Sequence, residues 1–213
     1  AQINPHFIYN VLNVISGRGI QNDDEVICEI CGQLASMLRY STNTKNRYAT
    51  LGEELEYTRE YFYLIKARYE DKIHMNVRLD PSIQNEIVPK TALQQIAENC
   101  INHGFHNSTE TMCVNINGYR KDGYWYVEVS DNGQGFAEDA LRELNGKMAI
   151  AKRRLFQEKS NIELEIGGMG LINTYVRLLL IYNDSLIFEL KNTRDGAMVV
   201  FGAKMQTEGI EDV

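Results

Sequence analysis

Three short motifs in the second half of the chain carry residue types suited to binding an adenine nucleotide. In chain order they are Glu98-Asn99-x-x-x-His103-Gly104, Asp131-x-Gly133-x-Gly135 and Gly168-x-Gly170-Leu171. An aspartate at the end of a strand can accept a hydrogen bond from the exocyclic amine of adenine, which guanine lacks. Glycines let the backbone turn sharply and approach a ligand without a Cβ clash. Together the motifs indicate an adenine-nucleotide pocket.

The residues of these motifs are suited to different parts of the nucleotide. Asn99 and His103 lie about 40° apart on a helical wheel, on the face opposite Leu93 and Ala97. The side-chain oxygen of Asn99 is a hard ligand suited to Mg²⁺ bridging the phosphates. Glu98 can orient a water molecule or accept a proton. The glycines at 168 and 170 open an apolar helix, whose free N–H groups and positive dipole end favour phosphate.

A fourth motif, Gln2-Ile-Asn-Pro-His6-Phe-Ile-Tyr-Asn10, stands at the start of the chain. A neutral imidazole can attack a γ-phosphoryl group in line, so His6 is a candidate nucleophile. Asn10 lies one helical turn further on, about 40° away, where it can hydrogen-bond the ring or the incoming phosphoryl group. Taken alone, His6 would be read as an ordinary histidine on a helix surface.

Helices come first among the elements that must position these residues. The apolar periodicity predicts helices over 2–16, 25–40 and 51–69. A turn at 17–24 joins the first two, with Asp23 or Asp24 as the N-cap of the second. Two amphipathic helices with a short connection indicate an antiparallel hairpin. Because one partner helix cannot cover both apolar stripes, we expect two copies to form a homodimeric four-helix bundle.

Strands and helices alternate after residue 71. Period-two alternation predicts strands over 73–79, 112–119, 124–130, 185–190 and 197–204. Helices are expected over 89–105, with Pro89 in the first turn, over about 139–156 and over 171–182. The stretch between the glycine motifs would form a lid over the ligand. The fold class is therefore α+β, with a helical region over 1–70, an α/β domain over 71–207 and an acidic tail over 208–213.

Composition excludes several other classes of protein. The net charge of the 213 residues is 22 − 29 = −7, which argues against nucleic acid as the main partner. No apolar run approaches the roughly 20 residues of a membrane helix. Because the first residues already look helical, we expect a fragment, and any membrane segment would lie upstream. The Cys28-x-x-Cys31 pair lies too far from His103-x-x-His106 for a zinc finger, so buried thiols are expected.

The motifs together resemble those of a known family. The three in the second half resemble the N box and the two glycine boxes of the GHKL ATPase superfamily. The motif around His6 resembles the phosphoacceptor motif of sensor histidine kinases of the LytS/YesM-like group. Arg39-Tyr40 and the acidic residues Glu53 and Glu54, ahead of a Tyr-rich helix, also fit that group.

The resemblance implies a dimerising helical hairpin followed by a Bergerat-type α/β-sandwich that binds ATP and Mg²⁺. It implies autophosphorylation on His6, with Asn10 and Glu98 as further catalytic residues and Asn99 as the metal ligand. The nucleotide contacts that the resemblance implies are Asn99, His103, Asp131, Gly133, Gly135, Gly168, Gly170 and Leu171. The implied acceptor is an aspartate of a response regulator. The chain would be the cytoplasmic part of a protein held in the cell membrane.

Two residues depart from the family pattern. Phe7 stands where many histidine kinases have an acid directly after the histidine, so the general base is left unassigned. Asn102 stands where the N box often has Lys, which removes one phosphate contact. Two alternatives stay open: a conformational ATPase of the same superfamily, in which Glu98 activates water without a phosphohistidine, and a degenerate binding module.

Overall fold

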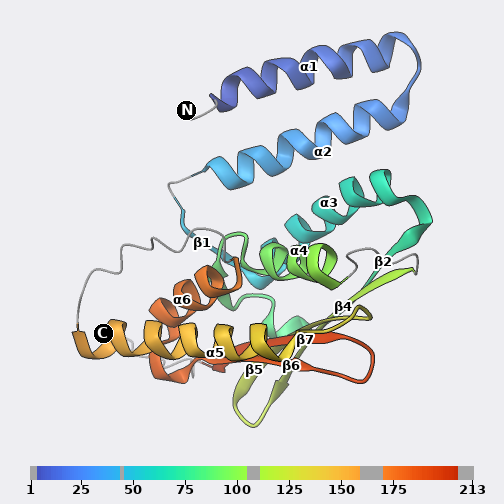
Figure 1. Ribbon diagram of the computed structural model, residues 1–213. Helices are drawn as coiled ribbons and strands as arrows, with labels where there is room; N and C mark the ends of the chain where they lie inside the picture. The colour runs from blue at the N-terminus through green and yellow to red at the C-terminus, as the bar shows by residue number, and fades with distance from the viewer. Residues whose placement is uncertain (1–3, 44–45, 105–110, 159–169, 206–213) are drawn as a thin grey trace, which may run out of the picture.

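The computed structural model describes residues 4–43, 46–104, 111–158 and 170–205. Two antiparallel helices, α1 (Pro5–Gln21) and α2 (Glu25–Thr42), form a hairpin that projects from one side of the molecule (Figure 1). Asn4 caps α1 by accepting a hydrogen bond from the backbone N–H of His6 at 3.0 Å. Asp24 caps α2 in the same way, which confirms one of the two predicted caps.

The predicted turn at Gly17–Gly19 is wrong, because α1 continues through both glycines to Gln21. Packing explains Gly19: a Cβ there would lie 2.9 Å from the sulfur of Cys28 on α2. This glycine therefore lets the two helices approach closely instead of ending the first one. The reversal comes later, at Asp23, which has φ of +54°.

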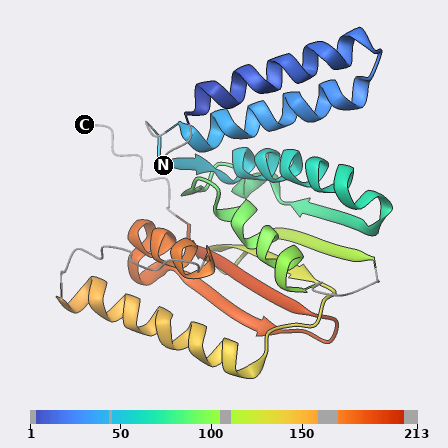
Figure 2. The ribbon, with the colours of Figure 1, turned by 45° about the horizontal axis from the view of Figure 1, so that its top comes forward.

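The third helix, α3 (Leu51–Tyr69), lies between the hairpin and the rest of the molecule (Figure 2). It begins with a capping box in which Thr50 and Glu53 satisfy each other's backbone N–H groups. Leu51, Leu55 and Phe62 on this helix belong to the main hydrophobic core. The helix thus packs as part of the α/β region, and a domain boundary at residue 70 stays a prediction.

The main sheet has five strands in the order β2-β4-β5-β7-β6. They are β2 (Ile73–Leu79), β4 (Met112–Lys121), β5 (Tyr124–Asp131), β7 (Ala197–Lys204) and β6 (Ile187–Asn192). Only the β2–β4 pair of this sheet is parallel. Side chains of β5 alternate between the two faces, and Trp125, Val127 and Val129 are fully buried on the face that the helices cover. A small sheet of β1 (Tyr48–Thr50) and β3 (Ile87–Pro89) lies apart from it.

Three further helices cover the buried face of the sheet: α4 (Ala92–Gly104), α5 (Glu138–Arg153) and α6 (Gly170–Tyr182). A π-helical turn, η3 (Arg154–Glu158), extends α5. The prediction that Pro89 begins the fourth helix is wrong. Pro89 pairs with Tyr48 in the small sheet, and Thr91, with φ of +64°, turns the chain into α4. The predicted acidic tail and Phe105 lie outside the described residues.

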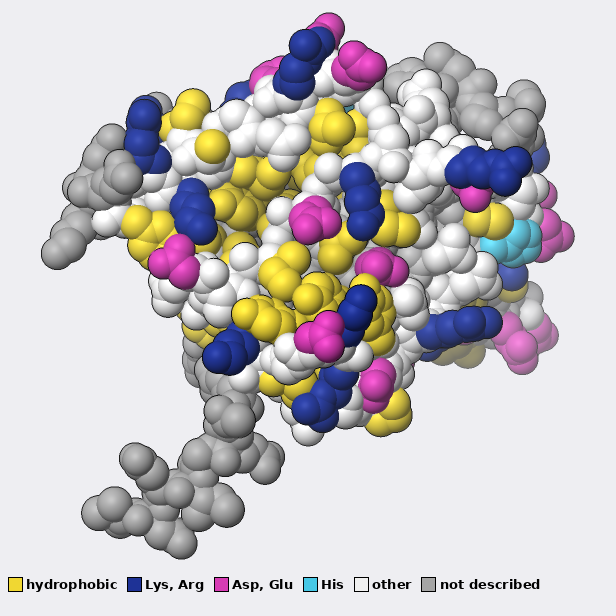
Figure 3. Space-filling model, turned by 90° about the horizontal axis from the view of Figure 1, so that it is seen from below, with side chains coloured by type: hydrophobic (Ala, Val, Ile, Leu, Met, Phe, Trp, Pro, Cys, Tyr) yellow, Lys and Arg dark blue, Asp and Glu magenta, His cyan; other side chains and the backbone are white. Residues whose placement is uncertain are grey.

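Large hydrophobic side chains reach the surface in both regions. The lower face of the α/β region carries basic and acidic side chains interspersed around hydrophobic ones (Figure 3). On the hairpin, large hydrophobic side chains follow one another along α1, where Phe7, Val14 and Ile20 are 64%, 67% and 69% exposed. Among the described residues, no helix is both long and apolar enough to cross a membrane.

Candidate functional site

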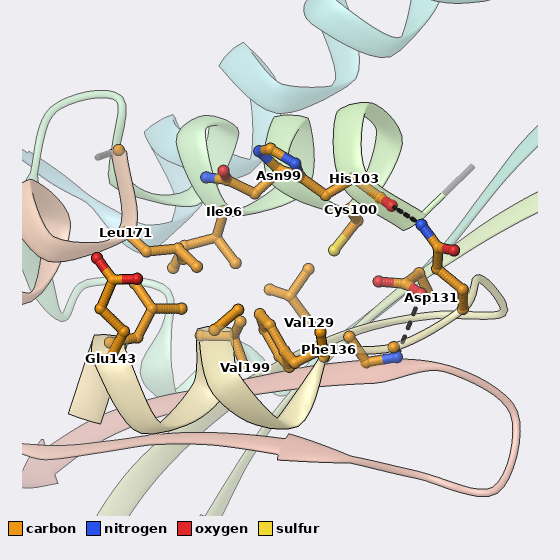
Figure 4. Close-up of a pocket in the computed structure, with 17 residues that line it drawn as sticks. Ile96, Asn99, Cys100, His103, Val129, Asp131, Phe136, Glu143, Leu171 and Val199 are labelled. Carbon is orange, nitrogen blue, oxygen red and sulfur yellow. Dashed lines mark hydrogen bonds between the residues drawn. The ribbon is translucent and has the colours of Figure 1, made fainter. Parts of the chain in front are cut away.

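A cavity of about 420 Å³ lies between α4, α5, α6 and the buried face of the sheet. Ile96, Val129 and Leu171 form much of its apolar wall, and polar groups stand at its two ends (Figure 4). Of the residues expected to bind a nucleotide, the cavity is lined by Asn99, His103, Asp131, Gly135, Gly170 and Leu171. Residues more than 70 positions apart in the sequence are thus brought to one site. The volume and the few convergent polar groups are typical of a small-molecule site.

Asp131 is the buried acid of this cavity, with 4% of its surface exposed. Its Oδ1 accepts hydrogen bonds from the backbone N–H of Gly133 at 2.8 Å and from that of Ala197 at 3.2 Å. These two bonds fix the carboxylate at the end of β5, and the side chain is directed into the cavity (Figure 4). The second oxygen takes part in neither of these two bonds, and it can accept a hydrogen bond from a ligand.

Two supporting residues lie between the last two predicted strands, where no sequence pattern indicated a role for them. A Cβ at Gly196 would lie 2.3 Å from the carbonyl oxygen of Asp131, so only glycine fits beside it. Asn192, at the end of β6, donates to the carbonyl of Phe136 at 2.9 Å and accepts from its N–H at 2.7 Å. It thereby holds the turn containing Gly135, whose φ is +73°. No local signal in the sequence joins positions 192 and 136.

The polar face of α4 forms the opposite wall. The amide nitrogen of Asn99 donates to the carbonyl of Gln95 at 2.6 Å, which fixes the side chain along its own helix. A Cβ at Gly170 would lie 3.3 Å from this nitrogen, so α6 begins in close contact with Asn99. The carbonyl of His103 accepts a hydrogen bond from the side chain of Gln134 at 3.1 Å, which ties the end of α4 to the first glycine motif.

Cys100 stands between Asp131 and the apolar wall and lines the same cavity. Burial raises the pKa of its thiol, and the neighbouring carboxylate of Asp131, to which the thiol hydrogen-bonds, raises it further. The thiol therefore stays protonated at neutral pH and acts as a hydrogen-bond donor. The expectation of buried thiols is met by Cys31 and Cys100, whereas Cys28 and Cys113 are half-buried.

Three of the residues expected at the nucleotide pocket are not among those that line the cavity, and one of them, Gly133, instead donates its backbone N–H to Asp131. Glu98 lies on another side of α4, where its carboxylate accepts from the side chains of Gln94 at 2.8 Å and Asn102 at 3.4 Å. Gly168 lies outside the described residues. Instead, Glu143 of α5 lines the cavity near Leu171 and forms an ion pair with Lys147 (Figure 4).

His6 lies on the exposed first turn of α1, away from the cavity. The amide nitrogen of Asn10 is 3.3 Å from Nδ1 of the imidazole, so the expected contact between these two side chains is present. The structure thus contains two separate sites, an exposed histidine on the hairpin and a polar cavity in the α/β region. Both views of the ribbon place α2 between α1 and the α/β region (Figures 1 and 2).

Comparison with known proteins finds relatives that match across both regions of the chain. The histidine kinase family model matches residues 1–73. The sensor protein LytS of Oceanobacillus iheyensis is 30% identical over 94% of this chain and 33% of its own length. The sensor histidine kinases YesM of Bacillus subtilis and BtsS of Escherichia coli are each 30% identical, over 69% and 84% of this chain. The chain spans about a quarter to a third of these relatives' length.

The fold agrees with these relationships. The catalytic domain of the histidine kinase ThkA superimposes on 74% of this chain and 93% of its own length, with a TM-score of 0.50 and 14% sequence identity. At that identity the likeness concerns the fold, which is the helix-covered mixed sheet of the GHKL type. The hairpin, the sheet and the relatives at 30% identity agree: the chain belongs to the LytS/YesM-like group of sensor histidine kinases.

Proposed function

We propose that this chain binds Mg·ATP in the cavity and transfers the γ-phosphoryl group to His6. The observation that carries the proposal is the arrangement of Asp131. One of its oxygens is saturated by two backbone N–H groups, and its side chain faces a cavity walled by apolar residues. A flat, apolar base with an exocyclic amine matches this environment, because the amine would satisfy the second oxygen of a buried acid.

Other residues around the cavity provide the remaining contacts that we propose for the phosphates and Mg²⁺. Gly170 begins α6, and the N–H groups of a helix's first turn favour phosphate. Asn99 has its amide nitrogen bound to Gln95, so its oxygen is the atom offered to Mg²⁺. We assign His103, Gly133, Gly135 and Leu171 to the walls around the nucleotide, and Gly168 to the same glycine motif. Bound Mg²⁺ would neutralise charge on the phosphates during transfer.

His6 is the proposed acceptor of the phosphoryl group. An Asn amide can present its oxygen as well as its nitrogen, so Asn10 can accept the Nδ1–H of the neutral ring. That tautomer places the lone pair on Nε2, which is the nitrogen pointing away from Asn10. The Nε2–P bond forms as the bond from the γ-phosphorus to its bridging oxygen breaks, and ADP leaves. Glu98 stays a proposed proton acceptor, although its carboxylate is bound along α4 in this structure.

The binding partners of the chain are also part of this proposal. The apolar stripe of α1 would pack against a second copy in a four-helix bundle, since exposed side chains of this size are usually covered. Phosphohistidine has a high transfer potential, so an aspartate of a response regulator would receive the group. Because the net charge is negative, we do not expect nucleic acid to be a partner. Attachment to the cell membrane would reside in other parts of the full-length protein.

Incubation with γ-labelled ATP and Mg²⁺ tests the proposal directly. The wild-type chain should acquire an acid-labile, alkali-stable label, and His6→Ala should acquire none while still binding Mg·ATP. His74→Ala removes another exposed histidine, on β2, and should be labelled like the wild type. Equal labelling of His6→Ala and wild type would show that the nucleophile is another residue. Steady ATP hydrolysis without any phosphoprotein would instead favour the conformational ATPase.

A further inference from the structure

Glu54 is a carboxylate buried at the junction between the hairpin and the α/β region. It lies on α3, and none of its surface is exposed. Burial raises its pKa, and three hydrogen bonds and the nearby Arg177 of α6 oppose that effect. A charge removed from water is costly unless it is hydrogen-bonded, so the donors around Glu54 determine how stable this arrangement is.

Two of the three donors belong to the start of α4. The backbone N–H of Thr91 donates to Oε1 at 2.6 Å, and that of Leu93 donates to Oε2 at 3.0 Å. Thr91 has φ of +64°, an uncommon conformation for a β-branched residue, so the entry into α4 depends on these bonds. Glu54 thereby acts as the N-terminal cap of α4 from a different helix. The same helix carries Asn99 and His103 into the cavity.

The third donor belongs to the hairpin. The hydroxyl of Tyr40, near the end of α2, donates to Oε1 of Glu54 at 2.6 Å. The ring of Tyr40 stacks on that of Tyr57 with centroids 4.3 Å apart, and the ammonium of Lys90 lies 4.6 Å from the Tyr40 centroid. The backbone carbonyl of Lys90 in turn accepts a hydrogen bond from Arg177. One carboxylate oxygen is thus shared by α2 and by the start of α4.

We propose that Glu54 is a positioning residue for α4 and that the Tyr40 hydroxyl makes this position depend on the hairpin. Movement of α2 that withdraws the hydroxyl leaves Glu54 with fewer donors, so the carboxylate holds the Thr91 turn less firmly. The start of α4 then shifts or loosens, and Asn99 moves with it. What α4 binds rests on the proposed function, whereas the coupling between α2 and α4 does not.

Tyr40→Phe is the test, because it removes one hydroxyl and keeps the ring that stacks on Tyr57. Tyr63→Phe is a matched control: the hydroxyl of Tyr63 on α3 hydrogen-bonds Glu29 on α2, which is a Tyr–Glu contact between the same two helices that involves no residue of α4. Hydrogen exchange of the amides at 91–97 should become roughly ten- to a hundredfold faster in Tyr40→Phe, the usual effect of losing a hydrogen bond to a charged group. It should be unchanged in Tyr63→Phe, and the amides of β5 and β7 should exchange as in wild type in both variants.

A second measurement uses nucleotide affinity in a double-mutant cycle. Tyr40→Phe and Glu54→Gln should each weaken Mg·ATP binding several-fold, and Tyr40→Phe should have little further effect in the Glu54→Gln background. Additive effects, or exchange at 91–97 no faster in Tyr40→Phe than in Tyr63→Phe, would overturn the coupling. If the wild-type chain bears no phosphohistidine, the proposed function fails. The exchange result still decides the inference, because it requires neither nucleotide nor transfer.

Discussion

Asp131 shows how one side chain is prepared for a ligand by its neighbours. Its Oδ1 is fixed by the N–H groups of Gly133 and Ala197, and Gly196 provides the space for this packing. The motif around Asp131 was visible in the sequence, because an acid followed by spaced glycines is a local pattern. The contribution of Gly196 was not, because the close approach joins strands that only the folded sheet brings together.

Asp131→Asn should therefore weaken ATP binding by at least tenfold. The Asn oxygen can still accept from Gly133, but its NH₂ group would then face the exocyclic amine of adenine, and two donors cannot bond each other. Titration with a fluorescent ATP analogue measures the change, with circular dichroism as the control for folding. Retention of wild-type affinity would mean that the base binds elsewhere in the cavity.

Cys100 offers a way to locate the nucleotide without any transfer reaction. Because burial and Asp131 raise the pKa of its thiol, alkylation by iodoacetamide should be slow at pH 7 and should accelerate as the pH rises. Saturating Mg·ATP should slow this alkylation severalfold, since Cys100 lines the cavity. Cys113, half-buried on the opposite face of the sheet, is the internal control and should react equally with and without nucleotide. Peptide mass spectrometry follows both thiols, and equal protection of the two would contradict the assignment.

At the scale of elements, the periodicity of the sequence correctly predicted the bounds of those helices and strands that depend on local packing. The bounds predicted for α3 and β2 match the structure, because their apolar residues repeat regularly and Thr50 and Asp71 flank them. The predicted turn at Gly17 and Gly19 failed because a glycine can equally serve close helix packing. The prediction that Pro89 lies in the first turn of a helix failed for a related reason, because proline suits both a helix start and an edge strand. These choices depend on tertiary neighbours.

The two hydrogen bonds between Asn192 of β6 and the backbone of Phe136 lead to a prediction at this scale. Asn192→Ala removes both hydrogen bonds to the backbone of Phe136, so the turn with Gly135 should become less ordered. We expect Mg·ATP affinity to fall about three- to tenfold, in line with the loss of one or two neutral hydrogen bonds. Asn115→Ala is the control, because Asn115 bonds Asn76 on the exposed face of the sheet and should leave binding unchanged. If both variants bind Mg·ATP with the same affinity, the hydrogen bonds between Asn192 and Phe136 have no part in forming the site.

At the scale of the whole molecule, the histidine and the cavity lie in different regions joined through α2 and α3. His6 is exposed on α1, and the cavity is enclosed by α4, α5, α6 and the sheet. The transfer we propose therefore needs either a movement of the hairpin or a cavity supplied by a second copy. Both possibilities make the surface of the hairpin functionally important.

The hairpin surface that would mediate pairing is the apolar stripe Phe7, Val11, Val14 and Ile15, which recurs at helical spacing and is exposed throughout. Val14→Glu places a charge at its centre, and burying that charge in an interface is unfavourable. We expect the variant to sediment as a monomer at micromolar concentration and to lose most of its His6 labelling, with unchanged affinity for Mg·ATP. Asn13→Glu adds the same charge beside the stripe, at an exposed polar position, and should stay dimeric and labelled. A Val14→Glu monomer with wild-type labelling would mean that a single chain can bring its own His6 to its own cavity, and the hairpin would then have to move relative to α3.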